Sequence, residues 1–246
     1  MKNKTVIITG AASGIGKATA LLFAKQGASV VISDIQEAEG KATTESITKT
    51  GGKASFFKTD VSRPEDMEAL VAFAVKTYDK LDVAVNNAGI GGELNPIADM
   101  SIEGWQKVIS INLNSLFYGM KYQIQAMLKS GGGSIVNISS ILGAVGFAGS
   151  AGYSAAKHGV IGLTQTAALE YAAHNIRINA VGPGFIDTPL LKALDDEMKQ
   201  QIIALHPIGR LGKSEEIAEL IWWLSSDKAS FVNGSYYPID GGYLAK

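Results

Sequence analysis

Tyr153 and Lys157 stand four residues apart in a stretch, about residues 152–173, whose pattern predicts a helix. Positions i and i+4 of a helix face the same side, so the phenol and the ammonium would lie together. A neighbouring positive charge favours the ionised phenol and lowers its pKa from about 10. A tyrosine tuned in this way can give or take the proton of a C–O–H group. A half-buried tyrosine with a lysine lying alongside it would show the same spacing without any chemistry.

A glycine-rich turn, Thr9–Gly16, follows the first apolar run, Thr5–Thr9, and opens the first predicted helix. Glycines in such a turn let the backbone approach a pyrophosphate, and the helix N-terminus then presents free N–H groups to it. The spacing is G-x-x-x-G-x-G rather than the G-x-G-x-x-G of the general dinucleotide fingerprint. Glycines also make ordinary tight turns, but the place of this turn indicates a dinucleotide site. Its predicted cofactor-binding residues are Gly10, Ser13, Gly14, Ile15 and Gly16.

Asp34 ends the second predicted strand, eighteen residues after Gly16. A carboxylate there can accept hydrogen bonds from both ribose hydroxyls of an adenosine, and it would repel a 2′-phosphate. NADP sites usually place Arg or Lys nearby to pair with that phosphate. Here Ser13 and Ile35 occupy the positions where a basic residue could serve, so the sequence predicts NAD rather than NADP. The alternative is an aspartate that only forms a turn at the end of a strand.

Polar and small residues end two further predicted strands. Asp60 could bond the adenine amino group while Val61 packs on the ring. The fourth strand ends in Asn86-Asn87-Ala88-Gly89, where the small Ala88 and Gly89 would let a cofactor lie against the backbone. Asp60, Val61, Asn87, Ala88 and Gly89 are therefore predicted to bind the cofactor.

The elements that must position these groups follow a regular alternation of strands and helices. Helices are predicted at about 15–26, 36–50, 65–78, 101–129, 152–173 and 214–226. Strands are predicted at Thr5–Thr9, Ser29–Ser33, Ser55–Lys58, Val83–Asn86, Ser134–Ile138, Arg177–Val181 and Tyr236–Ile239. Such alternation, with strands that are continuously apolar, is typical of a parallel sheet covered on both faces. The predicted fold class is α/β, with a single doubly wound domain over residues 1–246.

The motifs, taken in order, resemble those of the short-chain dehydrogenases/reductases in their common one-domain form. The matching residues are Thr9–Gly16, Asn86–Gly89, Asn112, Ser140, Tyr153–Lys157, Pro183-Gly184 and Asp240-Gly241-Gly242. The resemblance covers nearly the whole chain. It implies a seven-stranded parallel sheet of Rossmann type and hydride transfer between a nicotinamide and an alcohol or carbonyl carbon.

The resemblance also implies four catalytic roles. Tyr153 would be the general acid/base, and Lys157 would lower its pKa and hold the nicotinamide ribose. Ser140, thirteen residues before the tyrosine, would hold the carbonyl oxygen. Asn112 would keep open a small kink in its helix and seat a water that relays protons to Lys157.

Residues 184–212 form a long excursion from the carboxyl end of the sixth predicted strand, where ligands of open α/β sheets bind. Long excursions are often lids, so this segment is predicted to be a substrate loop. The resemblance implies that Pro183, Gly184, Ile186 and Thr188 grip the nicotinamide amide, Ile186 through its backbone and Thr188 through its hydroxyl.

The predicted walls of the substrate pocket are mostly apolar, and each of them could instead belong to the core. They are Ile141, Leu142, Val145, Phe147, Phe185, Leu190, Leu191 and Leu194, with Gly91, Gly92 and Glu93 at the rim. Lys192 is the only basic residue in this set, whereas a pocket for a carboxylate or phosphate would want a well-placed Arg. An uncharged ketone or secondary alcohol is therefore expected.

Composition limits the other functions. A net charge of −1 gives no electrostatic footprint for nucleic acid or for an anionic membrane. The absence of cysteine and the spacing of the three histidines predict no metal site. The start of the chain has no apolar signal region and no run reaches membrane-spanning length, so a cytoplasmic protein is expected.

Two alternatives stay open: an NADPH-dependent 3-oxoacyl-carrier-protein reductase, and a protein that senses NAD(H) without turnover. The basic residue that the first usually carries in its glycine turn is replaced here by Ser13. The intact set of Asn112, Ser140, Tyr153 and Lys157 argues against the second. The resemblance further implies a homo-oligomer, a dimer formed by the helices at 101–129 and 152–173, commonly within a tetramer.

Overall fold

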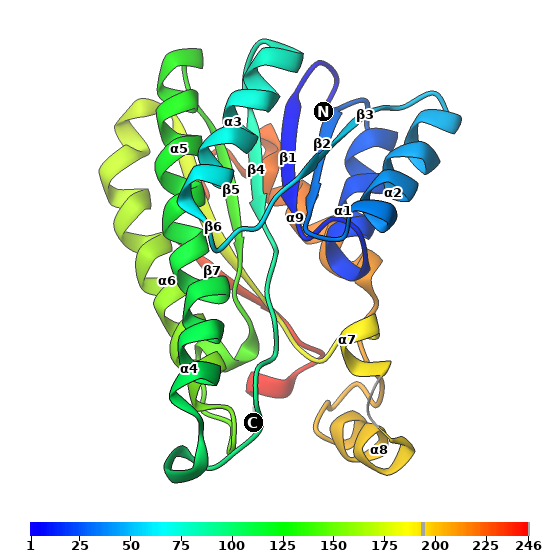
Figure 1. The fold of residues 1–246 in the computed structure, drawn as a ribbon, viewed down its shortest axis with the longest axis vertical. Helices are drawn as coiled ribbons and strands as arrows, with labels where there is room; N and C mark the ends of the chain where they lie inside the picture. Colours follow the sequence, from blue (N-terminus) through cyan, green and yellow to red (C-terminus); the bar gives the residue numbers. More distant parts are fainter. Residues whose placement is uncertain (193–194, 246) are drawn as a thin grey trace.

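The computed structural model describes residues 1–192 and 195–245, which form one α/β domain around a seven-stranded parallel sheet (Figure 1). The strand order is β3-β2-β1-β4-β5-β6-β7. The strands are β1 (Thr5–Thr9), β2 (Ser29–Asp34), β3 (Lys53–Lys58), β4 (Val83–Asn86), β5 (Gly133–Ile138), β6 (Ile176–Pro183) and β7 (Tyr236–Ile239). The predicted fold class is confirmed.

Strand boundaries differ from the prediction where pairing extends a strand beyond its apolar run. β3 begins at Lys53 rather than Ser55, because Lys53 continues the ladder opposite Ser29 on β2. β6 reaches Pro183, which pairs with Ile239 on β7. The hydropathy of a residue does not reveal that a neighbouring strand lies beside it.

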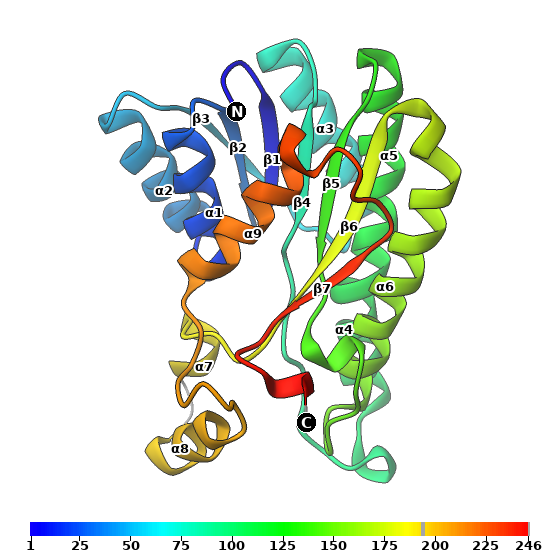
Figure 2. The same ribbon diagram turned by 180° about the vertical axis from the view of Figure 1, so that it is seen from behind.

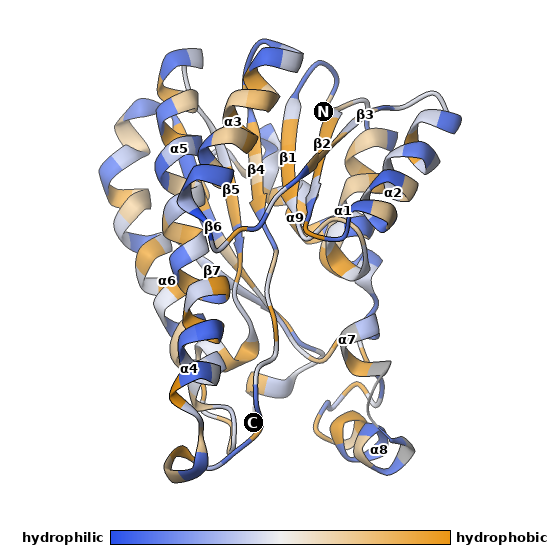
Figure 3. Ribbon diagram, in the orientation of Figure 1, coloured by the Kyte–Doolittle hydropathy of each residue, from blue (hydrophilic) through white to orange (hydrophobic). Residues whose placement is uncertain are grey.

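Helices cover both faces of the sheet (Figure 2). One face carries α1 (Gly14–Lys25), α2 (Glu37–Lys49) and α9 (Ser214–Ser225). The other carries α3 (Pro64–Tyr78), α5 (Ser115–Ser130) and α6 (Ala151–Tyr171). The side chains of β1 alternate between the two cores: Val6 and Ile8 pack toward α1 and α9, and Ile7 packs toward α3 and α5. Figure 3 shows the consequence, apolar strands enclosed by helices whose outer faces are polar.

The predicted helix at 101–129 is divided in two. α4 (Ile102–Ile109) is separated from α5 by a π-helical turn, Ser110–Asn114. α5 ends at Gly131, whose φ of +88° places it in the left-handed region that favours glycine. A π-turn inserts one extra residue into a helix and often marks a functional site, and Asn112 lies within this one.

The excursion at 184–212 contains two short helices that the sequence pattern did not predict. They are α7 (Pro189–Lys192) and α8 (Asp196–Ala204), and both lie beyond the carboxyl ends of the strands (Figure 1). The Asp195 carboxylate caps α8 by accepting a hydrogen bond from the Met198 N–H at 2.8 Å. Leu194, a predicted pocket residue, lies outside the described residues.

The order of the strands reverses between β1 and β4, the place where ligands of such sheets bind. The glycine-rich turn follows β1 and Asn86–Gly89 follows β4, so both motifs meet at this point. Within residues 1–192 and 195–245, no helix has the length and apolar character needed to cross a membrane.

Candidate active site

Lys157 is a buried lysine, 4% exposed, on the side of α6 that faces the sheet. Its Nζ donates a hydrogen bond of 2.8 Å to the Ile138 carbonyl at the end of β5. The Ser139 hydroxyl donates to the Lys157 carbonyl at 2.9 Å, which ties α6 to β5 a second time. Burial lowers the pKa of Lys157 to about 8, because the charged ammonium is poorly solvated. The lysine is thus held where it can lose its proton near neutral pH.

Tyr153 lies one turn earlier on the same side of α6, with its ring centroid 5.5 Å from Lys157 Nζ. The sequence predicts a lowered pKa for this phenol, and the structure shows the opposite. Burial raises the pKa of Tyr153, and a hydrogen bond with Ser140 only opposes that rise. The reason is burial, which disfavours the phenolate, and the Lys157 ammonium is directed to the Ile138 carbonyl.

The two adjacent serines after β5 have different partners. Ser140 begins the short helical turn Ile141–Gly143, and its hydroxyl oxygen accepts a hydrogen bond from the Leu142 N–H at 3.2 Å. Its carbonyl accepts one from the Tyr236 hydroxyl at 2.8 Å. The Ser140 side chain is therefore the one that adjoins Tyr153, whereas Ser139 is occupied with the backbone of α6.

Asn112 holds the segment that follows β4. Its Oδ1 accepts a hydrogen bond from the Ile90 N–H at 2.8 Å, and its Nδ2 donates to the Ile90 carbonyl at 2.7 Å. A Cβ placed on Gly89 would lie 2.9 Å from Asn112 Oδ1 and 3.7 Å from Lys157 Nζ. The predicted kink is present as the π-turn, and glycine is needed where Asn112 and Lys157 approach the β4 loop. The proton-relaying water stays a prediction.

The glycine-rich turn is packed too closely for side chains. Gly10 has a φ of +66°, and a Cβ there would lie 2.9 Å from Ala88 Cα. A Cβ on Gly16 would collide with the Gly10 carbonyl oxygen. The Asn87 amide donates to the Thr9 carbonyl at 2.9 Å and to the Gly10 carbonyl at 3.1 Å, so its side chain joins β4 to the turn. The turn therefore presents backbone rather than side chains where it leads into α1, and such a surface fits a pyrophosphate.

Asp34 brings a carboxylate beside that turn. Its Oδ2 accepts a hydrogen bond from the Ala12 N–H and its Oδ1 one from the Gln36 N–H, each at 3.0 Å. Ser13 and Ile35 are both exposed and uncharged, so neither supplies a cation beside this carboxylate. The Asp34 side chain could accept hydrogen bonds from an adenosine ribose, and the choice between NAD and NADP stays a prediction.

The two residues predicted to bind adenine are engaged in contacts within the protein. Asp60 Oδ1 accepts hydrogen bonds from the Ser62 N–H at 3.0 Å and the Ser62 hydroxyl at 2.7 Å, so this oxygen serves its own turn. Val61 is partly buried against the core beneath α3. A role in binding adenine stays a prediction for both.

The segment after β6 returns to the glycine-rich turn. Ile186 pairs with Gly212 in a parallel bridge, and its side chain is buried. Because the side chain is buried, a ligand could contact Ile186 only through its backbone. Thr188 contacts the turn, because a Cβ on Gly14 would lie 3.3 Å from Thr188 Cγ2. The structure thus places Gly14 of the predicted pyrophosphate turn next to Thr188 of the predicted nicotinamide segment.

An aromatic group lies next to this segment. The Phe185 ring stands edge-on to the rings of Phe147, His206 and Tyr243, at centroid distances of 6.2, 5.7 and 6.2 Å. Phe147 is 37% exposed, as a pocket wall should be in a protein without substrate. His206 and Tyr243 were not predicted to belong to this aromatic group, because they are far apart in the chain and carry no motif of their own.

Three other predicted pocket residues have structural tasks. Ile141 and Leu142 are buried, so they support the site rather than border open space. Glu93 accepts hydrogen bonds from the Ser101 hydroxyl at 2.7 Å and the Ser101 N–H at 3.2 Å, at the start of α4. These bonds hold the pKa of Glu93 below its usual range. Among the described residues there is no group of three or more His, Asp or Glu side chains arranged to hold a metal ion.

Comparison with known proteins agrees with this architecture. The sequence model of a family described as enoyl-(acyl carrier protein) reductase matches residues 10–244. Cyclohexanol dehydrogenase of Acinetobacter sp. (strain SE19) is 53% identical over 99% of this chain and 96% of its own length. Cis-4-hydroxycyclohexanecarboxylate dehydrogenase of Sinomonas cyclohexanicum is 45% identical, over 98% and 97% of the two chains.

The fold has a close counterpart among solved structures. The crystal structure of levodione reductase superposes with a TM-score of 0.97, at 37% identity, and covers 100% of this chain and 99% of that one. The chain belongs to the short-chain dehydrogenase/reductase family, and it is an oxidoreductase. Dehydrogenases of this family use a nicotinamide cofactor.

Proposed function

We propose that the protein is an NAD(H)-dependent dehydrogenase of uncharged cyclic secondary alcohols and the corresponding ketones. The observation that carries the proposal is the convergence of Tyr153, Ser140 and Lys157 beside a backbone cradle bordered by Asp34. The cradle would hold the pyrophosphate, Asp34 the adenosine ribose, and the backbone around Ile186 with Thr188 the nicotinamide end. A bound nicotinamide supplies or accepts the hydride.

The side chains around Tyr153 manage the proton. In ketone reduction the Tyr153 phenol gives its proton to the carbonyl oxygen, and in alcohol oxidation the phenolate takes it back. Ser140 donates a hydrogen bond to the same oxygen as charge develops on it. Lys157, held by the Ile138 carbonyl, and Asn112, which fixes the loop beside it, keep a proton donor within reach of the phenol.

The phenol needs its pKa lowered for this task, and burial does the reverse in the protein without cofactor. The positive charge of an oxidised nicotinamide next to Tyr153 would favour the phenolate. The acid–base group therefore becomes active when the cofactor is in place, which limits chemistry in the free protein.

The substrate side supports a cyclic, uncharged molecule. Phe147 and Phe185 present ring edges and faces next to the segment that would hold the nicotinamide. Relatives at 53% and 45% identity are named for hydroxylated cyclohexanes. The second of these substrates carries a carboxylate, which makes the charge of the substrate the sharpest point to test.

A panel of cyclohexanol, cyclohexanone and 4-hydroxycyclohexanecarboxylate, each with NAD(H) and NADP(H), tests the proposal. Turnover read by NADH absorbance is expected to favour the neutral ring compounds with NAD(H). Preference for the carboxylate would overturn the uncharged substrate. Turnover of a 3-oxoacyl thioester with NADPH would instead support a 3-oxoacyl-carrier-protein reductase, the activity for which a relative at 41% identity is named. Binding without any turnover would support an NAD(H) sensor.

Asp34→Asn tests the cofactor preference, because it removes the charge and keeps the shape. The ratio of kcat/KM with NADPH to that with NADH should rise by at least about tenfold. Glu45→Gln, which removes a charge from the exposed face of α2 about two turns after the start of that helix, is the matched control and should leave the ratio unchanged. An unchanged ratio in Asp34→Asn would contradict the role of Asp34.

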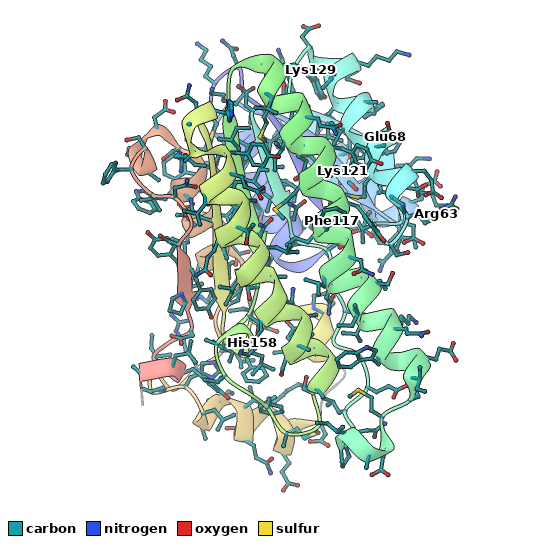
Figure 4. The ribbon with its side chains drawn as sticks, turned by 90° about the vertical axis from the view of Figure 1, so that its left-hand side faces the viewer. Arg63, Glu68, Phe117, Lys121, Lys129 and His158 are labelled. Carbon is teal, nitrogen blue, oxygen red and sulfur yellow. The ribbon has the colours of Figure 1, made fainter. Side chains whose placement is uncertain are left out.

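The outer face of α5 and α6 is the proposed interface of a homodimer, within a tetramer. Figure 4 shows the two helices side by side, with Phe117 on α5 and His158 on α6. Phe117 is half exposed on this face. Phe117→Glu should shift the protein toward monomer in sedimentation velocity, and a sedimentation profile that does not change would place the interface elsewhere.

A further inference from the structure

His206 is a buried histidine, 3% exposed, in the turn that follows α8. Its Nε2 lies 3.2 Å from the backbone nitrogen of Phe185, and its Nδ1 lies 2.9 Å from the Ile202 carbonyl oxygen. A carbonyl can only accept a hydrogen bond and a backbone N–H can only donate one. Nδ1 must therefore carry the hydrogen, and Nε2 must be bare. The geometry fixes one neutral tautomer of this ring.

The Phe185 N–H donates its hydrogen bond to His206 and belongs to the segment proposed to hold the nicotinamide. On one side of Phe185, the Gly184 N–H donates to the Ile239 carbonyl at 3.0 Å. On the other, the Phe185 carbonyl accepts a hydrogen bond from the Gly212 N–H at 3.0 Å. A Cβ on Gly184 would lie 2.9 Å from His206 Nε2, so the imidazole lies directly against this backbone.

We infer that His206 is a positioning residue that holds the backbone of Gly184–Ile186 and the Phe185 ring in place for substrate and cofactor. It does so as the Nδ1–H tautomer, which leaves Nε2 free to accept the hydrogen bond of the Phe185 N–H. The inference rests on the proposed function for the task of the segment, but the hydrogen bond itself does not depend on it.

The charged groups that lie around the ring are held by partners other than the imidazole. Arg210 and Glu216 line the same cavity as His206, and they pair with each other at 2.6 Å. Asp240 also lines it, and its two carboxylate oxygens accept hydrogen bonds from the Gly242 and Leu244 N–H groups at 3.0 and 2.9 Å. Tyr243 adds an aromatic face with its ring centroid 5.7 Å from that of the imidazole.

Two substitutions of His206 by amide side chains separate the two hydrogen bonds of the imidazole. In His206→Gln the amide reaches the position of Nε2, where its oxygen can accept a hydrogen bond from the Phe185 N–H. In His206→Asn the amide reaches only the position of Nδ1, where it can donate to the Ile202 carbonyl. The first variant keeps the hold on Phe185, and the second loses it while the buried ring is replaced by a similar polar group.

Steady-state kinetics with cyclohexanol gives the first test. The KM of His206→Asn should lie about three- to tenfold above that of the wild type, the change expected from losing one hydrogen bond. His206→Gln should keep the wild-type KM, and kcat should be the same for all three proteins. A KM raised equally in both variants, or in neither, would overturn the inference.

The second test uses the protein without cofactor. Nitrogen-15 NMR of its three histidines, with His206 assigned by the signals missing from His206→Gln, should show the Nδ1–H tautomer. Hydrogen exchange of the Phe185 amide should be faster in His206→Asn than in wild type or His206→Gln. The other tautomer, or equal exchange in both variants, would overturn the inference. If no protein turns over cyclohexanol, the proposed function fails, and the tautomer and the exchange rates still decide the role of His206.

Discussion

Two regions of the molecule meet at the carboxyl ends of the strands, and they are built differently. In the first region three predicted catalytic residues are buried, and each is hydrogen-bonded to the backbone of another residue near the carboxyl ends of β4 and β5. They are Lys157, Asn112 and Ser140, which are 4%, 2% and 8% exposed. The excursion at 184–212 lies outside the sheet (Figure 1). It is closed on itself by the Ile186–Gly212 bridge and the His206–Phe185 hydrogen bond. The Gly184 N–H ties its start to the Ile239 carbonyl at the end of β7 at 3.0 Å.

The region behind the catalytic groups is locked further by a buried amide network. The Asn86 amide donates to Gln123 at 3.0 Å and to Asn137 at 2.9 Å, and Asn137 donates to Thr164 at 2.9 Å. These bonds join β4 and β5 to α5 and α6 below the site. The residues proposed to handle the proton therefore lie in the core, whereas those proposed to contact the substrate lie on a surface segment. Substitutions in the first region should therefore affect stability together with kcat, and those in the second should affect KM.

The largest effect is expected at Tyr153, which can separate chemistry from stability within the core region. Tyr153→Phe should lower kcat by about a thousandfold, because the proton donor is lost. The free energy of unfolding should change by less than about 1 kcal/mol, since only the phenol hydroxyl is removed. Tyr171→Phe, on the same helix and outside the site, should leave kcat unchanged. Turnover unaffected in Tyr153→Phe would falsify the proposed mechanism.

Lys157 predicts how the stability of the core region depends on pH. Its pKa of about 8 in the folded protein lies below the ordinary value of 10.5, so the unfolded chain binds more protons between these two values. Stability should therefore rise with pH across that interval, by up to about 3 kcal/mol. Urea unfolding at pH 7 and at about pH 10 should show that Lys157→Met lacks this rise. A rise of equal size in both proteins would assign it to other groups.

Asn112 is expected to have an intermediate effect on both quantities. Asn112→Ala breaks both hydrogen bonds to Ile90 and leaves buried backbone groups without partners, so unfolding free energy should fall by about 2 kcal/mol. The kcat should fall as well, because the loop beside Lys157 loosens. Denaturant titration and steady-state kinetics on one preparation test both. A loss of kcat without a loss of stability would show that Asn112 acts through chemistry alone.

The smallest effect is expected in the surface region. Phe147→Ala should raise the KM for cyclohexanol about threefold and change unfolding free energy by less than about 0.5 kcal/mol, because the ring is partly exposed. Phe231→Ala, which removes a fully exposed ring, is the control and should change neither. A destabilised Phe147→Ala protein with an unchanged KM would mean that this ring belongs to the core, and the contrast between the two regions would be lost.

The sequence by itself determined the features that depend on neighbours along the chain. All seven strands were predicted from their apolar runs, and β1 and β4 are buried along their whole length, as strands covered on both faces should be. The glycine-rich turn was found for the same kind of reason: Gly10 and Gly14 adopt positive φ angles, which other residues rarely tolerate. The spacing of Tyr153 and Lys157 likewise placed both on one side of a helix.

Only the tertiary structure decided what depends on contacts between distant residues. The π-turn at Asn112 accompanies two hydrogen bonds to Ile90, twenty-two residues away. The tautomer of His206 is set by Phe185, on another element. Burial raises the pKa of Tyr153, opposite to the predicted direction, and outweighs the hydrogen bond with Ser140. Solvation and hydrogen-bond partners are properties of the folded environment, and no local spacing specifies them.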